Sequence, residues 1–286
     1  MPTCLMPRLF HLTSRLTSRS TTCLSAVKRP LQAICLVLSA ALVSGCATDI
    51  KPNQATGMPV LAVQKMSLNP SNGGQLIQPD ALRAGDIILT AENGLNSVGI
   101  RLITLSPVSH AAVYLGDSQI AEAVGSGIRR RSMTDLLGDE ATVVAFRHPT
   151  ITSEQAAKIN AFTQLHDGKK YNYLGVMLQA PFALERRMCE LPLVPSLMRD
   201  YCIRGIAMVQ LGLGSNDQFF CSQFILEAYR SAGLPLTDAD PRLINPGDLM
   251  HMREGDVPSV MTNQMLQYVG HLKAPPLVAV VERLAN

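Results

Sequence analysis

The feature that most constrains this chain is an amphipathic segment with a cysteine near its start. The stretch FFCSQFILEAYRSAGLPL, residues 219–236, places apolar side chains at helical spacing and ends near a glycine, which is a typical stop signal. The apolar positions are Phe220, Phe224, Ile225, Ala228 and Tyr229, and the glycine is Gly233. Cys221 therefore falls in the first turn of the predicted helix, where unpaired N–H groups and the helix dipole favour a thiolate. The pattern fits either a buried core cysteine or, if the chain also supplies a base, a nucleophile.

A secretory leader precedes the domain. Residues 1–45 contain five basic residues and no acidic ones, and they end in the apolar run LQAICLVLSAALVSG, which is too short for a comfortable membrane span. The segment LVSGC at 42–46 resembles the lipobox of bacterial lipoproteins, in which the cysteine is acylated on its sulfur and on its new amino terminus. That resemblance implies a membrane anchor at Cys46 and, because Ala47 rather than aspartate follows, delivery to the outer membrane. The alternative is an ordinary cleaved signal that happens to include a cysteine.

Loss of this leader changes the charge of the chain. The 25 basic residues become 25 − 5 = 20 against 22 acidic ones, so the mature chain of 286 − 45 = 241 residues has a net charge near −2. We therefore expect no nucleic-acid partner. The basic run Arg129-Arg130-Arg131 is interpreted as a solvated face of a strand. The length is sufficient for a single domain with a sizeable core.

Cysteine usage points to one disulfide and one odd thiol. Three of the seven cysteines leave with the leader and Cys46 is assigned to the lipid, so Cys189, Cys202 and Cys221 remain. An oxidising periplasm favours pairing two of these three. Cys189 and Cys202 are close in sequence and flank a short loop that contains proline, so we predict that they form the disulfide. Cys221 is then the odd thiol.

Composition divides the remaining chain into a linker and one domain. Residues 46–78 are rich in proline, glycine and polar residues, which predicts a linker after the lipidated cysteine. The domain is expected to span 79–286, with an insertion at about 181–216 beside the site. The segment NPGDLMHMREGDVPS is interpreted as a loop, and His251 within it is the scattered histidine most expected to line the site. The chain has no His-Glu-x-x-His, Cys-x-x-Cys or Walker motif, so we expect no metal and no cofactor.

A predicted β-hairpin carries the candidate base. In SHAAVYLGDSQIAEAV, residues 109–124, two β-favouring runs flank the turn Gly-Asp-Ser. A three-residue turn pairs Ala112 with Glu122 and sets His110 diagonally across from Glu122 on one face. A carboxylate on one imidazole nitrogen fixes the tautomer and leaves the other nitrogen for a thiol. A one-residue change in the turn would separate the two side chains, leaving a polar strand start and an outward-facing glutamate.

Several segments, taken in chain order, resemble a known family. They are SHAAVYLGDSQIAEAVGSGI, KKYNYLG and FFCSQFILEAYRSAGLPL, joined by DLMHMREGDV, LQYVGHLK, the lipobox and the two cysteines at 189 and 202. Together they are similar to the YaeF/YiiX group of circularly permuted papain-like cysteine hydrolases, relatives of the NlpC cell-wall peptidases, and most of all to its YaeF lipoprotein branch. The resemblance covers nearly all of the mature chain. In this group the histidine strand precedes the cysteine helix, the reverse of the order in papain.

The resemblance implies an α+β fold in which an antiparallel sheet packs against the cysteine helix. It implies Cys221 as nucleophile, His110 as base and Glu122 as the orienting residue of a cysteine amidase or peptidase that works through an acyl-enzyme. Tyr171 matches a tyrosine near the site, whereas Asn172 replaces the aspartate of many members. The substrate is expected to be an envelope peptide, an acyl amino acid or a lipid. A thiol acyltransferase, a lipid esterase and a non-catalytic peptide- or lipid-binding lipoprotein remain alternatives.

Overall fold

The structure is a computed structural model of the whole chain. It describes residues 46–53, 56–65, 74–92, 94, 97–98, 101, 106–170, 182, 185–191, 193–210 and 220–274. No helix within these ranges combines the length and the apolar character needed to cross a membrane.

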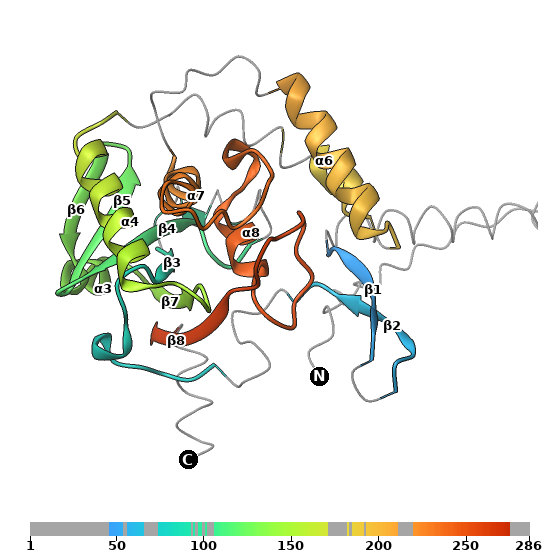
Figure 1. The fold of residues 1–286 in the computed structure, drawn as a ribbon, viewed down its shortest axis with the longest axis horizontal. Helices are drawn as coiled ribbons and strands as arrows, with labels where there is room; N and C mark the ends of the chain where they lie inside the picture. The colour runs from blue at the N-terminus through green and yellow to red at the C-terminus, as the bar shows by residue number, and fades with distance from the viewer. Residues whose placement is uncertain are drawn as a thin grey trace, which may run out of the picture.

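A six-stranded antiparallel sheet forms the centre of the fold, with strand order β6-β5-β4-β3-β7-β8 (Figure 1). Its strands are β3 (Ile87–Ala91), β4 (His110–Gly116), β5 (Gln119–Val124), β6 (Gly127–Ser132), β7 (Thr142–Arg147) and β8 (Gln267–Lys273). The central strand β3 is buried along its full length and pairs with β4 on one side and β7 on the other. The helices are α3 (Met133–Asp139), α4 (Ser153–His166), α6 (Ser196–Gln210), α7 (Cys221–Ser231) and α8 (Pro246–His251), and short 3₁₀ turns lie at Pro79–Ala81 and Pro241–Leu243.

Alternate residues of the sheet face two separate apolar clusters. Ile87 and Leu89 lie in the larger cluster, which includes the apolar face of α7, whereas Ile88 lies in a smaller cluster with Met133 and Leu136 of α3. This alternation is what the two-residue period of a strand requires when both faces of a sheet are covered. The predicted α+β fold, with the cysteine helix packed on an antiparallel sheet, is confirmed.

Local sequence signals account for the helix starts. Helix α4 begins with a capping box: the hydroxyl of Thr152 accepts from the N–H of Gln155, and the side-chain oxygen of Gln155 accepts from the N–H of Thr152. Helix α8 lies where we expected a loop, so that interpretation was wrong. Asn245 and Asp248 form the same kind of reciprocal cap, with Pro246 at the first helical position.

The structure also differs from the linker expected for residues 46–78. Strands β1 (Thr48–Pro52) and β2 (Pro59–Val63) pair as an antiparallel hairpin. The hairpin is bound to the domain, since Gln64 donates to the carbonyl of Val257 at 2.9 Å and Lys51 donates to the carbonyl of Asp256 at 2.6 Å. Pro52, Gly57 and Pro59 therefore belong to a folded element rather than to a free spacer.

Candidate active site

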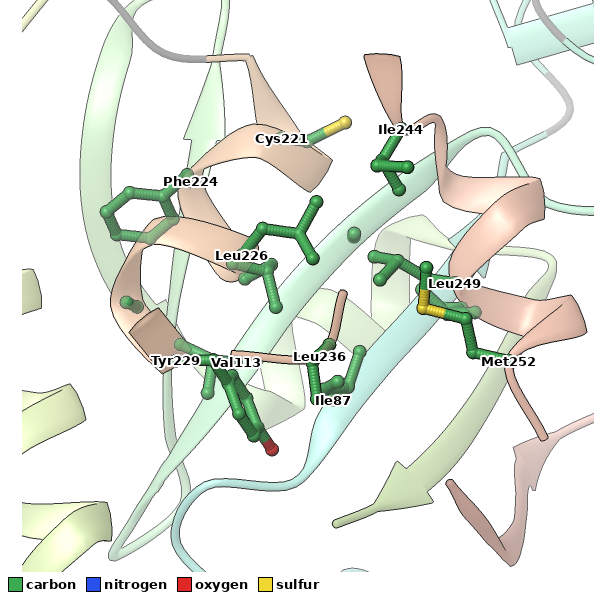
Figure 2. Close-up of a cluster of buried hydrophobic side chains, with 14 of the residues drawn as sticks. Ile87, Val113, Cys221, Phe224, Leu226, Tyr229, Leu236, Ile244, Leu249 and Met252 are labelled. Atoms are coloured by element: carbon green, nitrogen blue, oxygen red, sulfur yellow. The ribbon is translucent and has the colours of Figure 1, made fainter. Parts of the chain in front are cut away.

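Cys221 is the first residue of α7 and lies at the edge of the larger apolar cluster. The preceding residue, Phe220, has extended backbone angles and provides no side-chain cap for the helix. Cys221 is 7% exposed, and Figure 2 shows its side chain extending from the start of the helix on the side of Ile244. The thiol therefore lies beside the uncapped N–H groups of the first turn, as the sequence predicts.

The hairpin pairing that the site requires is present, although the turn differs from the prediction. Ala112 pairs with Glu122, as expected, but the loop has two residues, Asp117 and Ser118, both with positive φ. A bulge between Tyr114 and Gly116 restores the register that a two-residue turn would otherwise shift. The structure therefore brings His110 and Glu122 together through a different turn from the one we predicted.

Glu122 is completely buried and receives three cationic side chains. Its Oε2 lies 2.8 Å from Nε2 of His110, and its Oε1 lies 2.9 Å from Nε of Arg129. Arg131 adds an ion pair of 2.8 Å to Oε1. The two carboxylate oxygens thus have different partners: Oε2 binds the imidazole and Oε1 binds the two arginines.

These contacts lower the pKa of Glu122 and raise the pKa of His110. Burial alone raises the pKa of Glu122, but the hydrogen bond to His110, the charges of His110 and Arg131 and the hydrogen bond to Arg129 lower it to about 2. Burial likewise lowers the pKa of His110, but the interactions with Cys221 and Glu122 outweigh this and raise it to about 10. At neutral pH the pair is therefore a carboxylate and an imidazolium.

The second imidazole nitrogen is left for the cysteine. Because Nε2 of His110 is bound to Glu122, Nδ1 is the nitrogen that can act on Cys221. The Cys221 side chain is close enough to raise the pKa of His110 through hydrogen bonding and charge. A thiol, an imidazole and a buried carboxylate in series form the arrangement that activates a nucleophile.

The sequence interpretation missed the two arginines. We took Arg129 to Arg131 as a solvated face, but Arg129 and Arg131 contact Glu122, and only Arg130 points elsewhere, to Asn160 at 3.0 Å. Arg129 lies directly opposite Glu122 on the neighbouring strand, so the cross-strand register held the signal. Arg131 also forms an ion pair with the exposed Asp139, in which its Nη1 donates to Oδ2 at 2.6 Å.

A second buried carboxyl, Glu140, belongs to the electrostatic surroundings of the site. Burial raises its pKa, while the charges of His110 and Arg131 act in the opposite direction. Nothing in the sequence around Glu140 marks it as part of a site. Glu140 is the residue at which α3 ends, and its backbone N–H donates to the carbonyl of Leu136.

The other predicted residues are placed as follows. Cys189 and Cys202 are joined in a disulfide with Cα atoms 5.7 Å apart, and Cys46 lies two residues before β1. His251 is buried in α8 with Nδ1 3.1 Å from Oδ2 of Asp256, and its expected place beside the site stays a prediction. Tyr171 and Asn172 lie outside the described residues. Among the described residues, no three His, Cys, Asp or Glu side chains are grouped so as to hold a metal ion.

The chain is similar to a curated bacterial protein over most of its length. It is 36% identical over 244 residues to the protein named "Probable lipoprotein peptidase YaeF" from Escherichia coli strain K12, which covers 81% of this chain and 89% of that protein. No family model matches the chain. The crystal structure of the metalloprotein yiiX from Escherichia coli O157:H7 aligns with a TM-score of 0.40 at 18% identity, covering 68% of this chain and 98% of that one.

Proposed function

Because the chain belongs to the family of the probable lipoprotein peptidase YaeF, we propose that it is a lipid-anchored cysteine hydrolase of the bacterial envelope that cleaves an amide bond. The observation that carries this proposal is the His110 imidazole, which is bound to buried Glu122 through Nε2 and has Nδ1 left for Cys221 at the start of α7. Cys221 is the nucleophile, His110 the base and acid, and Glu122 the positioning residue.

The reaction begins with the Cys221 thiolate and the His110 imidazolium. The sulfur attacks the carbonyl carbon, and the imidazolium then gives its proton to the leaving amine as the carbon–nitrogen bond breaks. The product of this step is a thioester on Cys221 and a neutral imidazole. His110 next takes a proton from water, whose oxygen attacks the thioester and releases the acid and the thiolate.

The start of α7 is suited to the negative charge that develops on the carbonyl oxygen. Phe220 supplies no capping side chain, so the N–H groups of the first turn, including that of Cys221, can donate to the developing oxyanion. Glu122 stays ionised throughout, because its pKa of about 2 is far below that of His110. Its role is to hold the ring and stabilise its positive charge rather than to accept a proton.

The anchor is part of the same proposal. Cys46 in the lipobox-like LVSGC segment carries the acyl chains, and the domain faces the periplasm from the outer membrane. The substrate is a cell-envelope peptide, an acyl amino acid or a lipid. A thiol acyltransferase would use the same thioester but pass it to an acceptor other than water.

The test is to trap the thioester on Cys221 and identify its acyl group. The purified chain is incubated with pools of envelope peptides, acyl amino acids and phospholipids, quenched in acid and digested with trypsin. Cys221 falls in the tryptic peptide 205–230, separate from Cys189, Cys202 and Cys46, so a mass increase on that peptide is unambiguous. We expect the adduct in the native chain and not in Cys221→Ala.

The fate of the acyl group distinguishes the reactions. Release as a free acid indicates hydrolysis, and its appearance on an added amine or alcohol indicates transfer. If no pool yields an adduct, and substrate disappears no faster with the native chain than with Cys221→Ala, the proposal is wrong.

A further inference from the structure

Large apolar side chains are exposed mainly in one part of the molecule. Of thirteen that are exposed among the described residues, nine lie in the β1–β2 hairpin with its turn or between Leu193 and Tyr201. An exposed apolar surface of this kind marks a contact with another molecule or with a membrane.

The hairpin presents three of these side chains on one face. Ile50 pairs directly with Leu61, and Val63 lies two residues further along the same strand, so all three point to the same side. They are 68%, 54% and 44% exposed, respectively. Thr48 lies on that same face and accepts a hydrogen bond from the N–H of Leu193, just before α6.

Helix α6 presents a second apolar stripe beside the hairpin. Leu197, Met198 and Tyr201 are adjacent on the helix surface and are 63%, 65% and 79% exposed, whereas Arg199 and Ile203 on the opposite side are buried. Arg199 ties the helix to the hairpin by donating to the carbonyl of Thr48 at 2.6 Å. Figure 1 shows α6, β1 and β2 together on one side of the molecule.

The proposed lipid attachment, Cys46, adjoins the hairpin in sequence. Cys46 is two residues before β1, and the next residue, Ala47, is fully buried and bonded to Gln64 through both of its backbone groups. The mature chain would therefore have no spacer between its acyl chains and the folded domain. Acyl chains inserted in a bilayer must then hold the neighbouring apolar side chains at the lipid surface.

We propose that Ile50, Leu61 and Val63 of the hairpin and Leu197, Met198 and Tyr201 of α6 form a membrane-docking face that enters the interfacial region of the bilayer beside the lipidated Cys46. This inference rests on the lipid anchor of the proposed function but not on its catalytic step. The disulfide between Cys189 and Cys202 supports it, because it joins α6 to the helical turn at 185–189 and keeps the stripe in place. The consequence is a domain held in one orientation on the membrane rather than one that rotates on a tether.

The chain contains no tryptophan, so the fluorescence of a single introduced tryptophan reports only on the position where it is placed. Leu61→Trp and Tyr201→Trp each place a single tryptophan in the face, and Leu165→Trp places one at a position of α4 that is 76% exposed and outside the face. The full chain, processed and lipidated in cells, is reconstituted in phosphatidylethanolamine–phosphatidylglycerol vesicles with or without brominated acyl chains. Because interfacial residues reach about 5–10 Å into the boundary, we expect roughly twofold quenching at positions 61 and 201 and none at 165.

Each outcome decides the proposal. Equal emission of all three variants with and without bromine overturns it. A blue-shifted emission without bromine quenching also overturns it, because a second copy or another protein, not lipid, would then cover the face. Intact mass reports acylation of Cys46 separately; if Cys46 is unmodified, the anchor is refuted, and vesicles added to the same variants still decide whether the face binds lipid.

Discussion

Replacement of Glu122 by glutamine tests how the imidazole is held. Glu122 binds the arginines through Oε1 and His110 through Oε2, but glutamine has only one oxygen. If that oxygen stays with the two arginines, the amide NH₂ faces Nε2 of His110, which must then accept. The neutral ring would carry its proton on Nδ1, the nitrogen needed for the thiol, so the wrong tautomer would form.

The size of the effect follows from the pKa values of the pair. The pKa of Glu122 falls from 4.5 to about 2 against the effect of burial, so its three cations together stabilise the carboxylate by at least about 3 kcal/mol. His110 is the largest contributor, so loss of the carboxylate should lower the pKa of the imidazole by roughly one unit or more, and one unit corresponds to about 1.4 kcal/mol. We expect the pKa of His110 to fall from about 10 to about 9 or lower. The wrong tautomer should reduce kcat by about 10²- to 10⁴-fold.

Nitrogen NMR of the imidazole measures both the pKa and the tautomer. A chain without the leader has five histidines, and the His110 signals are those that His110→Gln removes. Asp139→Asn is the matched control, because it removes the outer partner of Arg131 without touching the imidazole. A His110 signal that keeps its pKa and its Nε2–H tautomer in Glu122→Gln would refute the assigned role of Glu122.

Three further outcomes follow from the same structure. His110→Gln should slow alkylation of Cys221 by iodoacetamide at pH 7 by about 10- to 100-fold, measured by mass spectrometry. Arg186→Met should lower the free energy of unfolding by about 3–5 kcal/mol in urea titrations, because it leaves Asp248 buried without its paired guanidinium at 2.7 Å. Lys158→Met, which removes an exposed ion pair on α4, is the control and should leave it almost unchanged. The free energy of unfolding should fall by up to about 3 kcal/mol as the pH is lowered from 4.5 toward 2, because the pKa of Glu122 is lower in the folded chain than in the unfolded chain. Glu122→Gln should flatten that part of the plot of stability against pH.

The parts of the fold that could be predicted are those with a local periodic signal. Helix α7 follows from its apolar spacing. The pairing of Ala112 with Glu122 was predicted from a three-residue turn, and it is right because the bulge after Tyr114 offsets the shorter turn. The turn could not be predicted in detail, because Asp117 and Ser118 suit a two-residue loop as well as part of a longer one. The bulge at Tyr114 then set the register.

The parts that were missed depend on contacts distant in sequence. The β1–β2 hairpin is bound by residues 256 and 257, some two hundred positions away, so its own proline and glycine content indicated only a linker. Arg129 and Arg131 acquire their role only once β6 is paired with β5. Helix α8 is different, because the signal for its cap was present in Asn245-Pro246 and Asp248 and was not used.

The two arginines explain why a buried carboxylate can orient His110 without competing for its proton. An isolated buried glutamate would rise in pKa and take the neutral form, and a neutral acid could not stabilise an imidazolium. His110, together with Arg131 and Arg129, instead holds Glu122 ionised with a pKa of about 2, while the pKa of His110 is raised to about 10. In the proposed mechanism the proton therefore stays on the imidazole until the leaving group takes it. Glu122 thus pairs with the imidazolium as well as with the arginines, and Asp139 offsets part of the charge of Arg131. In the proposed mechanism, attack on a carbonyl begins from Cys221 beside this imidazolium.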